Sequence, residues 1–95
     1  MSGTTLHVEL VSVEREVWSG EADSVVARTT EGEIGILPGH APLLGQLAEG
    51  YDVRILQAGG GELAVNVSGG FLSVTDQGVT ILAESATLPG ETAPV

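Results

Sequence analysis

Apolar and polar residues alternate in several short segments of this chain. Leu6, Val8 and Leu10 fall on one face of an extended segment, and His7 and Glu9 fall on the other. Later segments repeat this period of two, with apolar residues at Tyr51, Val53 and Ile55, at Leu63, Val65 and Val67, and at Val79, Ile81 and Ala83. The pattern predicts half-buried β-strands. We expect the core to include Leu6, Val8, Leu10, Val65, Val67, Val79 and Ile81.

Turn-forming residues separate these segments at intervals of about 8–12 residues, which is typical of β-sandwiches. The turn signals are Ser19-Gly20, Glu31-Gly32, Pro38-Gly39, Glu49-Gly50, Gly59-Gly60-Gly61, Gly69-Gly70 and Asp76-Gln77-Gly78. No window shows a sustained helical stripe, and fourteen glycines would weaken a helix. The chain is therefore expected to be all-β, with one domain over residues 1–86 and a flexible tail over residues 87–95.

Composition narrows the classes of partner. The 95 residues suit one domain, and 13 acidic side chains against three arginines give a formal charge of −10 without any lysine. This charge disfavours nucleic acids and anionic membrane surfaces but is compatible with basic protein partners. The absence of cysteine excludes disulfides, and the N-terminus does not resemble a signal peptide, so an intracellular location is favoured. Apolar stretches fall short of the ~20 residues of a spanning helix, so no membrane insertion is expected.

No motif indicates catalysis, a metal site or a bound cofactor. The triple glycine at 59–61 lacks the lysine of a phosphate-binding loop, and Ser68 lacks the glycine that precedes a nucleophile elbow. The two histidines belong to no ligand-spaced cluster. We interpret His7 as the solvent-face partner of Glu9, while His40 is either an interface contact or an ordinary loop residue.

A resemblance to a known family rests on the run from Glu31 to Leu44, EGEIGILPGHAPLL. This run closely resembles the signature loop of the epsilon subunit of F-type ATP synthases. The segments LHVELVS, VWSGEA and VSGGFLSV occur in the same order as in that family, and VTILAE looks like its last strand. The resemblance covers about residues 5–86.

The resemblance implies a two-sheet β-sandwich of about ten short strands, the N-terminal domain type of epsilon. It implies a non-catalytic rotor subunit of the central stalk, which couples the c ring to gamma during proton-driven ATP synthesis. Such a subunit is a peripheral part of the complex at the cytoplasmic face of the cell membrane. The two C-terminal helices of most family members have no counterpart in residues 87–95, so neither ATP binding nor inhibition of hydrolysis by this chain is expected.

The family also implies two groups of contact residues. The group expected to face the c ring is Thr30, Glu31, Gly32, Glu33 and Gly35. The group expected to face gamma is His40, Ala41, Pro42, Leu43 and Leu44, with Leu43 or Leu44 as an apolar anchor. The alternative function is a free-standing sandwich that binds a small ligand or carbohydrate. That function requires a concave site with convergent polar groups and aromatic side chains, and the chain has only three aromatic residues.

Overall fold

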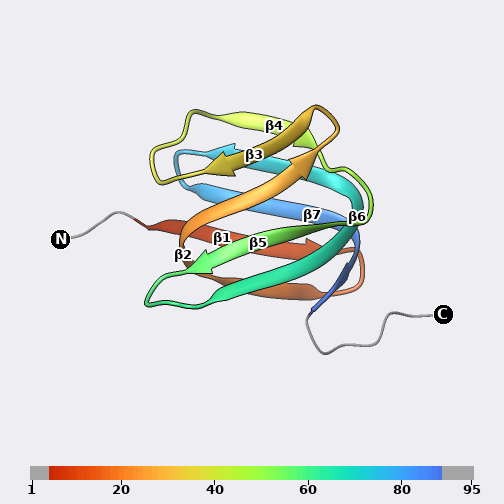
Figure 1. Cartoon of the computed structure of the whole chain (residues 1–95), viewed down its shortest axis with the longest axis horizontal. Helices are drawn as coiled ribbons and strands as arrows, with labels where there is room; N and C mark the ends of the chain where they lie inside the picture. Colours follow the sequence, from red (N-terminus) through yellow and green to blue (C-terminus); the bar gives the residue numbers. More distant parts are fainter. Residues whose placement is uncertain (1–4, 89–95) are drawn as a thin grey trace.

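The structure is a computed structural model that describes residues 5–88, and it contains seven β-strands and no helix in that range (Figure 1). The expected all-β class is confirmed. Residues 5–88 consequently hold no helix able to cross a membrane. The strands are β1 (Leu6–Ser12), β2 (Glu16–Thr29), β3 (Gly32–Ile36), β4 (Leu43–Gln46), β5 (Tyr51–Gln57), β6 (Glu62–Thr75) and β7 (Gly78–Thr87).

All seven strands belong to one hydrogen-bonded network that folds over into two layers. The strand order is β1-β7-β6-β5-β2-β3, with β4 paired to β6 and β1 paired a second time, to β2. All pairs are antiparallel except the parallel pair of β1 and β7. The first layer consists of β3, β5 and the strand segments paired with them. The second layer consists of β1, β4 and the strand segments paired with them.

Three long strands take part in both layers. The first half of β2 pairs with β1 and its second half with β5 and β3, while β6 pairs first with β5 and later with β4. The start of β7 pairs with β1, and its end pairs with the middle of β6. The structure therefore has seven strands, three of them long enough to take part in both layers, where about ten short strands were expected.

Local irregularities let the long strands bend. In β2 the register shifts between Ala22 and Ser24, which leaves one extra residue on that strand, and such a bulge bends a strand and increases its twist. In β6 the bend coincides with two glycines that have positive φ, of which Gly70 has φ 105°. A side chain at Gly70 would overlap the carbonyl oxygen of Leu82 on β7. Gly70 thus allows β6 to curve closely against β7, as Figure 1 shows.

The core lies between the layers and matches the alternation in the sequence. All seven residues expected there are buried, and Leu63 is half-buried against the same cluster. Tyr51 is the exception, since 49% of it remains exposed. It is the first residue of β5, and its ring stacks under the guanidinium of Arg28, whose Cζ lies 4.9 Å from the ring centroid. Trp18 is half-buried against the core.

The last strand extends past the expected end of the domain at residue 86. Strand β7 continues through Thr87, and Leu88 packs against the core, so the sandwich reaches slightly beyond residue 86. The remainder of the expected tail, residues 89–95, lies outside the described residues.

Candidate docking surface

We call the outward side of the second layer the outer face. Cross-strand register places its residues in rows that run from β4 across β6, β7 and β1 to β2. One row contains Gln46, Phe71, Leu82 and Val11; the next contains Leu44, Ser73, Thr80, Glu9 and Ser19; beyond them lie His7 and Glu21.

Apolar side chains lie close together at one side of the outer face. Phe71 is 52% exposed, Leu82 beside it on β7 is 47% exposed, and Leu44 in the adjacent row is 72% exposed. Val11 extends this group onto β1 and is half-buried. Single exposed apolar residues are common on protein surfaces, but a contiguous group rimmed by polar residues marks an interaction site. We call Leu44, Phe71, Leu82 and Val11 the apolar group.

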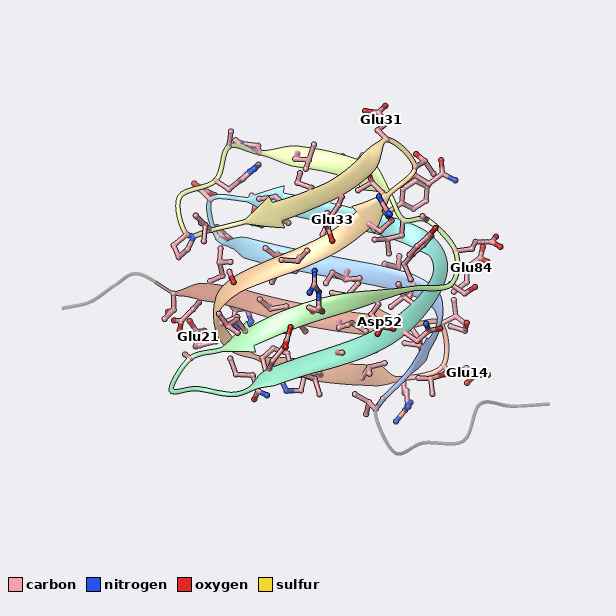
Figure 2. The ribbon with its side chains drawn as sticks, in the orientation of Figure 1. Glu14, Glu21, Glu31, Glu33, Asp52 and Glu84 are labelled. Carbon is pink, nitrogen blue, oxygen red and sulfur yellow. The ribbon has the colours of Figure 1, made fainter. Side chains whose placement is uncertain are left out.

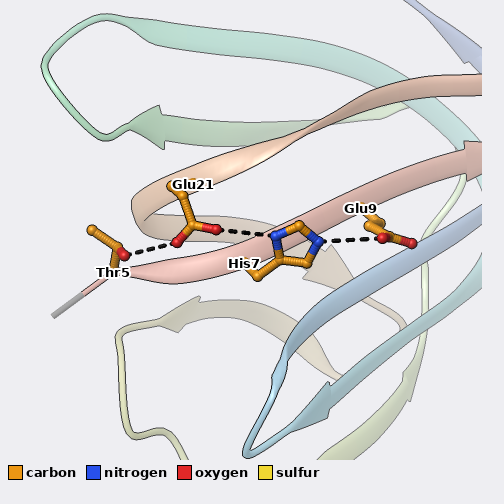
Figure 3. A network of polar contacts seen from close by, with 4 residues as sticks. All are labelled: Thr5, His7, Glu9 and Glu21. Atoms are coloured by element: carbon orange, nitrogen blue, oxygen red, sulfur yellow. Dashed lines mark hydrogen bonds and ion pairs between the residues drawn. The ribbon is translucent and has the colours of Figure 1, made fainter. Parts of the chain in front are cut away.

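A polar network occupies the other side of the outer face (Figure 3). His7 Nδ1 lies 3.0 Å from Glu21 Oε2, and His7 Nε2 lies 3.2 Å from Glu9 Oε2. The Thr5 hydroxyl donates to Glu21 Oε1 at 2.8 Å. Hydrogen bonds to Glu21 and then to Glu9 raise the pKa of His7, and the bonds from Thr5 and then His7 lower the pKa of Glu21. The expected pairing of His7 with Glu9 is confirmed, but the partnership with Glu21 was not foreseen.

The residues expected to face the c ring divide between the turn after β2, which holds Thr30 and Glu31, and strand β3, which holds Gly32, Glu33 and Gly35. The Thr29 hydroxyl accepts the N–H of Glu31 at 3.1 Å and donates to the Gly32 carbonyl at 2.8 Å. The Thr30 N–H donates to the Gln46 carbonyl at 2.9 Å, which ties the turn to the end of β4. Glu31 projects from the tip of this turn (Figure 2).

Glu33 points from β3 to a different neighbour. Its carboxylate pairs with Arg54 on β5 at 3.2 Å, and both side chains are about half-exposed. Figure 2 shows the labelled acidic residues on separate elements around the sandwich. Within residues 5–88, no three histidine or carboxylate side chains are placed to hold a metal ion together.

The segment expected to face gamma divides into inward and outward residues. His40 is half-buried; its backbone N–H donates to the Leu37 carbonyl at 3.1 Å, and its Nδ1 lies 2.7 Å from the Ala41 carbonyl, which makes Nδ1 the donor. Leu43 packs against the core. Of the two leucines that were expected to provide an anchor, Leu44 is therefore the one that faces outward.

The two expected groups meet along one seam of the sandwich. Residues 29–34 and 43–46 line a cleft of about 400 Å³ between the edge strands β3 and β4. The cleft brings Thr30, Glu31, Gly32 and Glu33 together with Leu43 and Leu44, whereas Gly35, His40, Ala41 and Pro42 do not line it. No aromatic side chain lines this cleft, so it is poorly suited to a carbohydrate.

Phe71, Leu82 and Val11 were not among the expected contact residues. The signal for two of them was present in the sequence. Leu72 and Ile81 occupy the inward positions of their strands, so the adjacent residues Phe71 and Leu82 must face outward. Large apolar residues at outward positions on adjacent strands indicate a covered surface. Recognising this requires the strand pairing, which places them side by side.

Residues 5–89 match the family described as ATP synthase, Delta/Epsilon chain, beta-sandwich domain. The ATP synthase epsilon chain of Frankia casuarinae is 61% identical over 83 residues, which are 87% of this chain and 96% of that protein. The epsilon chain of Rhodococcus opacus is 63% identical over 81 residues, which are 85% of this chain and 66% of that protein.

Solved structures give the same result. A chain in the Euglena gracilis mitochondrial ATP synthase structure of OSCP, F1 and c-ring superposes with a TM-score of 0.84 at 28% identity, covering 94% of this chain and 56% of its own length. A chain in the central stalk and c-ring structure of Tetrahymena thermophila has a TM-score of 0.67 at 18% identity, which supports the fold alone. The chain therefore belongs to the ATP synthase delta/epsilon family and carries its β-sandwich domain.

Proposed function

We propose that this chain is a structural subunit of the rotor of an ATP synthase, where it links the c ring to the gamma subunit. The support is membership of the family together with relatives named ATP synthase epsilon chain. The Euglena structure that contains a similar chain includes F1 and the c-ring. In this role the chain has no active site of its own and binds no ATP. It lies at the cytoplasmic face of the membrane as a peripheral part of the complex.

Gamma docks on the outer face, with the apolar group at the centre of the contact. The observation that carries this assignment is the continuity of Leu44 with Phe71 and Leu82, because Leu44 belongs to the segment that the resemblance places near gamma. The turn that leads into β4 is closed by the hydrogen bond from the His40 N–H to the Leu37 carbonyl, which lowers the cost of ordering this segment on binding. Burial of Phe71 and Leu82 against a complementary partner supplies most of the binding free energy.

The c ring contacts the turn between β2 and β3. In the family this acidic loop faces the polar loops of the ring, where basic residues are common. Glu31 is exposed at the tip and Glu33 already has a partner in Arg54, so Glu31 is the more available charge. Exposed ion pairs contribute about 0–1 kcal/mol each, so neither carboxylate is indispensable alone.

Co-purification of the tagged chain tests the proposal, since recovery of gamma and c subunits is the expected result. Isolation without either subunit would overturn the proposed function. Binding of the chain to gamma then tests the outer face. Leu82→Ala should weaken gamma binding by about 1–2 kcal/mol with little salt dependence.

Two controls separate the two contacts. Leu56 is 46% exposed, nearly the same fraction as Leu82, but lies on the outward side of the first layer, so Leu56→Ala should leave gamma binding unchanged. Glu31→Gln with Glu33→Gln should weaken ring association in a salt-sensitive way, whereas Glu14→Gln in the turn between β1 and β2 should not. Equal effects of Leu82→Ala and Leu56→Ala would refute the assignment of the outer face.

A further inference from the structure

The His7 network has a feature that apolar docking does not explain: both ring nitrogens of one exposed imidazole face carboxylates. Nδ1 lies 3.0 Å from Glu21 and Nε2 lies 3.2 Å from Glu9 (Figure 3). A neutral imidazole has a single N–H and can donate to only one of these groups. The lone pair of its other nitrogen would then face a carboxylate oxygen. Only the imidazolium satisfies both contacts at once.

The charged side chains that contact His7 reinforce this preference. Glu9 follows it on β1, and Glu21 faces it from β2. On the side of β7, the residues that line a hollow with His7 and Glu9 are uncharged: Thr75, Gln77, Gly78, Val79 and Thr80. In the same turn, Asp76 lines an adjacent hollow with Thr5 and with His40, the other histidine of the chain. Among these residues His7 is thus the cation that can balance Glu9 and Glu21. With its proton, the three side chains carry a net charge of −1; without it they carry −2.

The network lies on the surface assigned to gamma. His7, Glu9 and Val11 share the outward side of β1, and Val11 lies four positions beyond His7 along the strand, or about 13 Å. A standard interface buries roughly 800 Å² on each partner, which corresponds to a patch roughly 30 Å across. A partner centred on the apolar group therefore also covers His7.

Under the proposed function, we propose that gamma covers His7 in its imidazolium form, so that docking on the outer face is coupled to the uptake of a proton. Covering the network removes water that otherwise screens its charges, which strengthens the attraction between the imidazolium and both carboxylates. The unprotonated network would bring two unbalanced carboxylates into the interface at a larger desolvation cost. The two carboxylates therefore stabilise the imidazolium in the free chain, and more strongly in the complex.

This linkage fixes the sign of the pH dependence. The pKa of His7 is raised above its ordinary value of 6.5 in the free chain and rises further in the complex. The affinity for gamma is therefore highest at pH values below the pKa of His7 in the free chain. It falls as the pH rises from that pKa to the pKa of His7 in the complex, and it is constant at higher pH. A difference of about one pKa unit between the forms corresponds to about a tenfold increase in Kd across this window.

The test measures the Kd of the chain for gamma between pH 6 and pH 9, at constant ionic strength, for the parent and for His7→Gln. The parent should lose affinity with rising pH, and His7→Gln should show a flatter profile. A parallel titration of the His7 ring protons by nuclear magnetic resonance should give a higher pKa in the complex than in the free chain. This second measurement does not depend on the folding of a variant.

The outcomes separate the two proposals. Binding that is independent of pH, or equally steep for the parent and His7→Gln, would overturn the proton linkage while leaving gamma docking intact. Tighter binding at high pH would also overturn it, because a basic residue of gamma would then replace the proton between the carboxylates. Absence of binding at every pH would refute the proposed function itself.

Discussion

Replacement of Gly70 by alanine is expected to destabilise the fold far more than an ordinary glycine substitution. Gly70 has φ 105°, a backbone conformation that residues with a side chain rarely adopt. An added Cβ would overlap the carbonyl oxygen of Leu82 and lie 2.8 Å from the Cα of Ala83. Both obstacles belong to the backbone of β7, so no rotamer change can relieve the overlap.

The magnitude follows from two contributions. A positive φ costs a residue with a side chain about 1–2 kcal/mol. Relief of the overlap requires separating β6 from β7, which strains or lengthens ladder hydrogen bonds and disturbs the bond from the Leu47 N–H to the Gly70 carbonyl. We expect a total loss of about 3–5 kcal/mol. A domain of this length has about 5–14 kcal/mol of stability, so the variant should be marginal.

Gly59 provides a matched control for this substitution. It also has a positive φ, of 88°, but no atom lies within 4 Å of the position of its Cβ. Gly59→Ala should therefore cost only the conformational part, about 1–2 kcal/mol. Urea denaturation of both variants gives the comparison. If Gly70→Ala loses no more stability than Gly59→Ala, the close approach of β6 to β7 does not constrain the fold as argued.

Three further predictions concern the core, the polar network and the ion pair. Val65 is fully buried, so Val65→Ala should lower the free energy of unfolding by about 1–3 kcal/mol in urea denaturation. The contribution of His7 to the free energy of unfolding should be complete below pH 6.5 and disappear as the pH rises through its raised pKa. The contribution of Glu21 should be present above pH 4.5 and disappear as the pH falls through its lowered pKa. Denaturation across pH should show both slopes in the parent, and the alkaline slope should be absent in His7→Gln. A double-mutant cycle on Arg54 and Glu33 should give a coupling energy of about 0–1 kcal/mol, and a larger value would contradict the exposure of that pair.

The strands were predictable because their alternation reports burial directly. Val8, Leu10 and Ile81 are buried because alternate residues of a strand face the same side of the sheet. This alternation can be recognised without knowing the partner strand. Tyr51 obeys the same period yet remains half-exposed, because it begins its strand and finds a partner in Arg28. The alternation identifies a side of a strand, but the end of a strand need not be covered.

The bends and the outer face were less predictable, because they depend on contacts between residues far apart in the sequence. The Gly69-Gly70 pair indicates a turn by composition, whereas in the structure it lies inside β6, where the strand passes from one layer to the other. Likewise, His7 was expected to pair with Glu9 two residues away, but the pairing of β1 with β2 adds Glu21 from fourteen residues away. Sequence spacing predicts the first contact, and only strand register predicts the second.

Under the proposed function, the position of the two proposed contact surfaces bears on how a small domain can hold both partners. The turn with Glu31 and the exposed Leu44 lie on opposite sides of the β3–β4 seam. The Thr30 N–H, next to Glu31, donates across the seam to the carbonyl of Gln46, two residues from Leu44. Electrostatic contacts at the ring are individually weak, while the apolar contact with gamma is stronger. Once gamma is bound, the turn is held near the ring at a high effective concentration, so weak pairs suffice there. A rigid seam between the two surfaces preserves that advantage. With a flexible connection, conformational entropy would be lost each time the second contact formed.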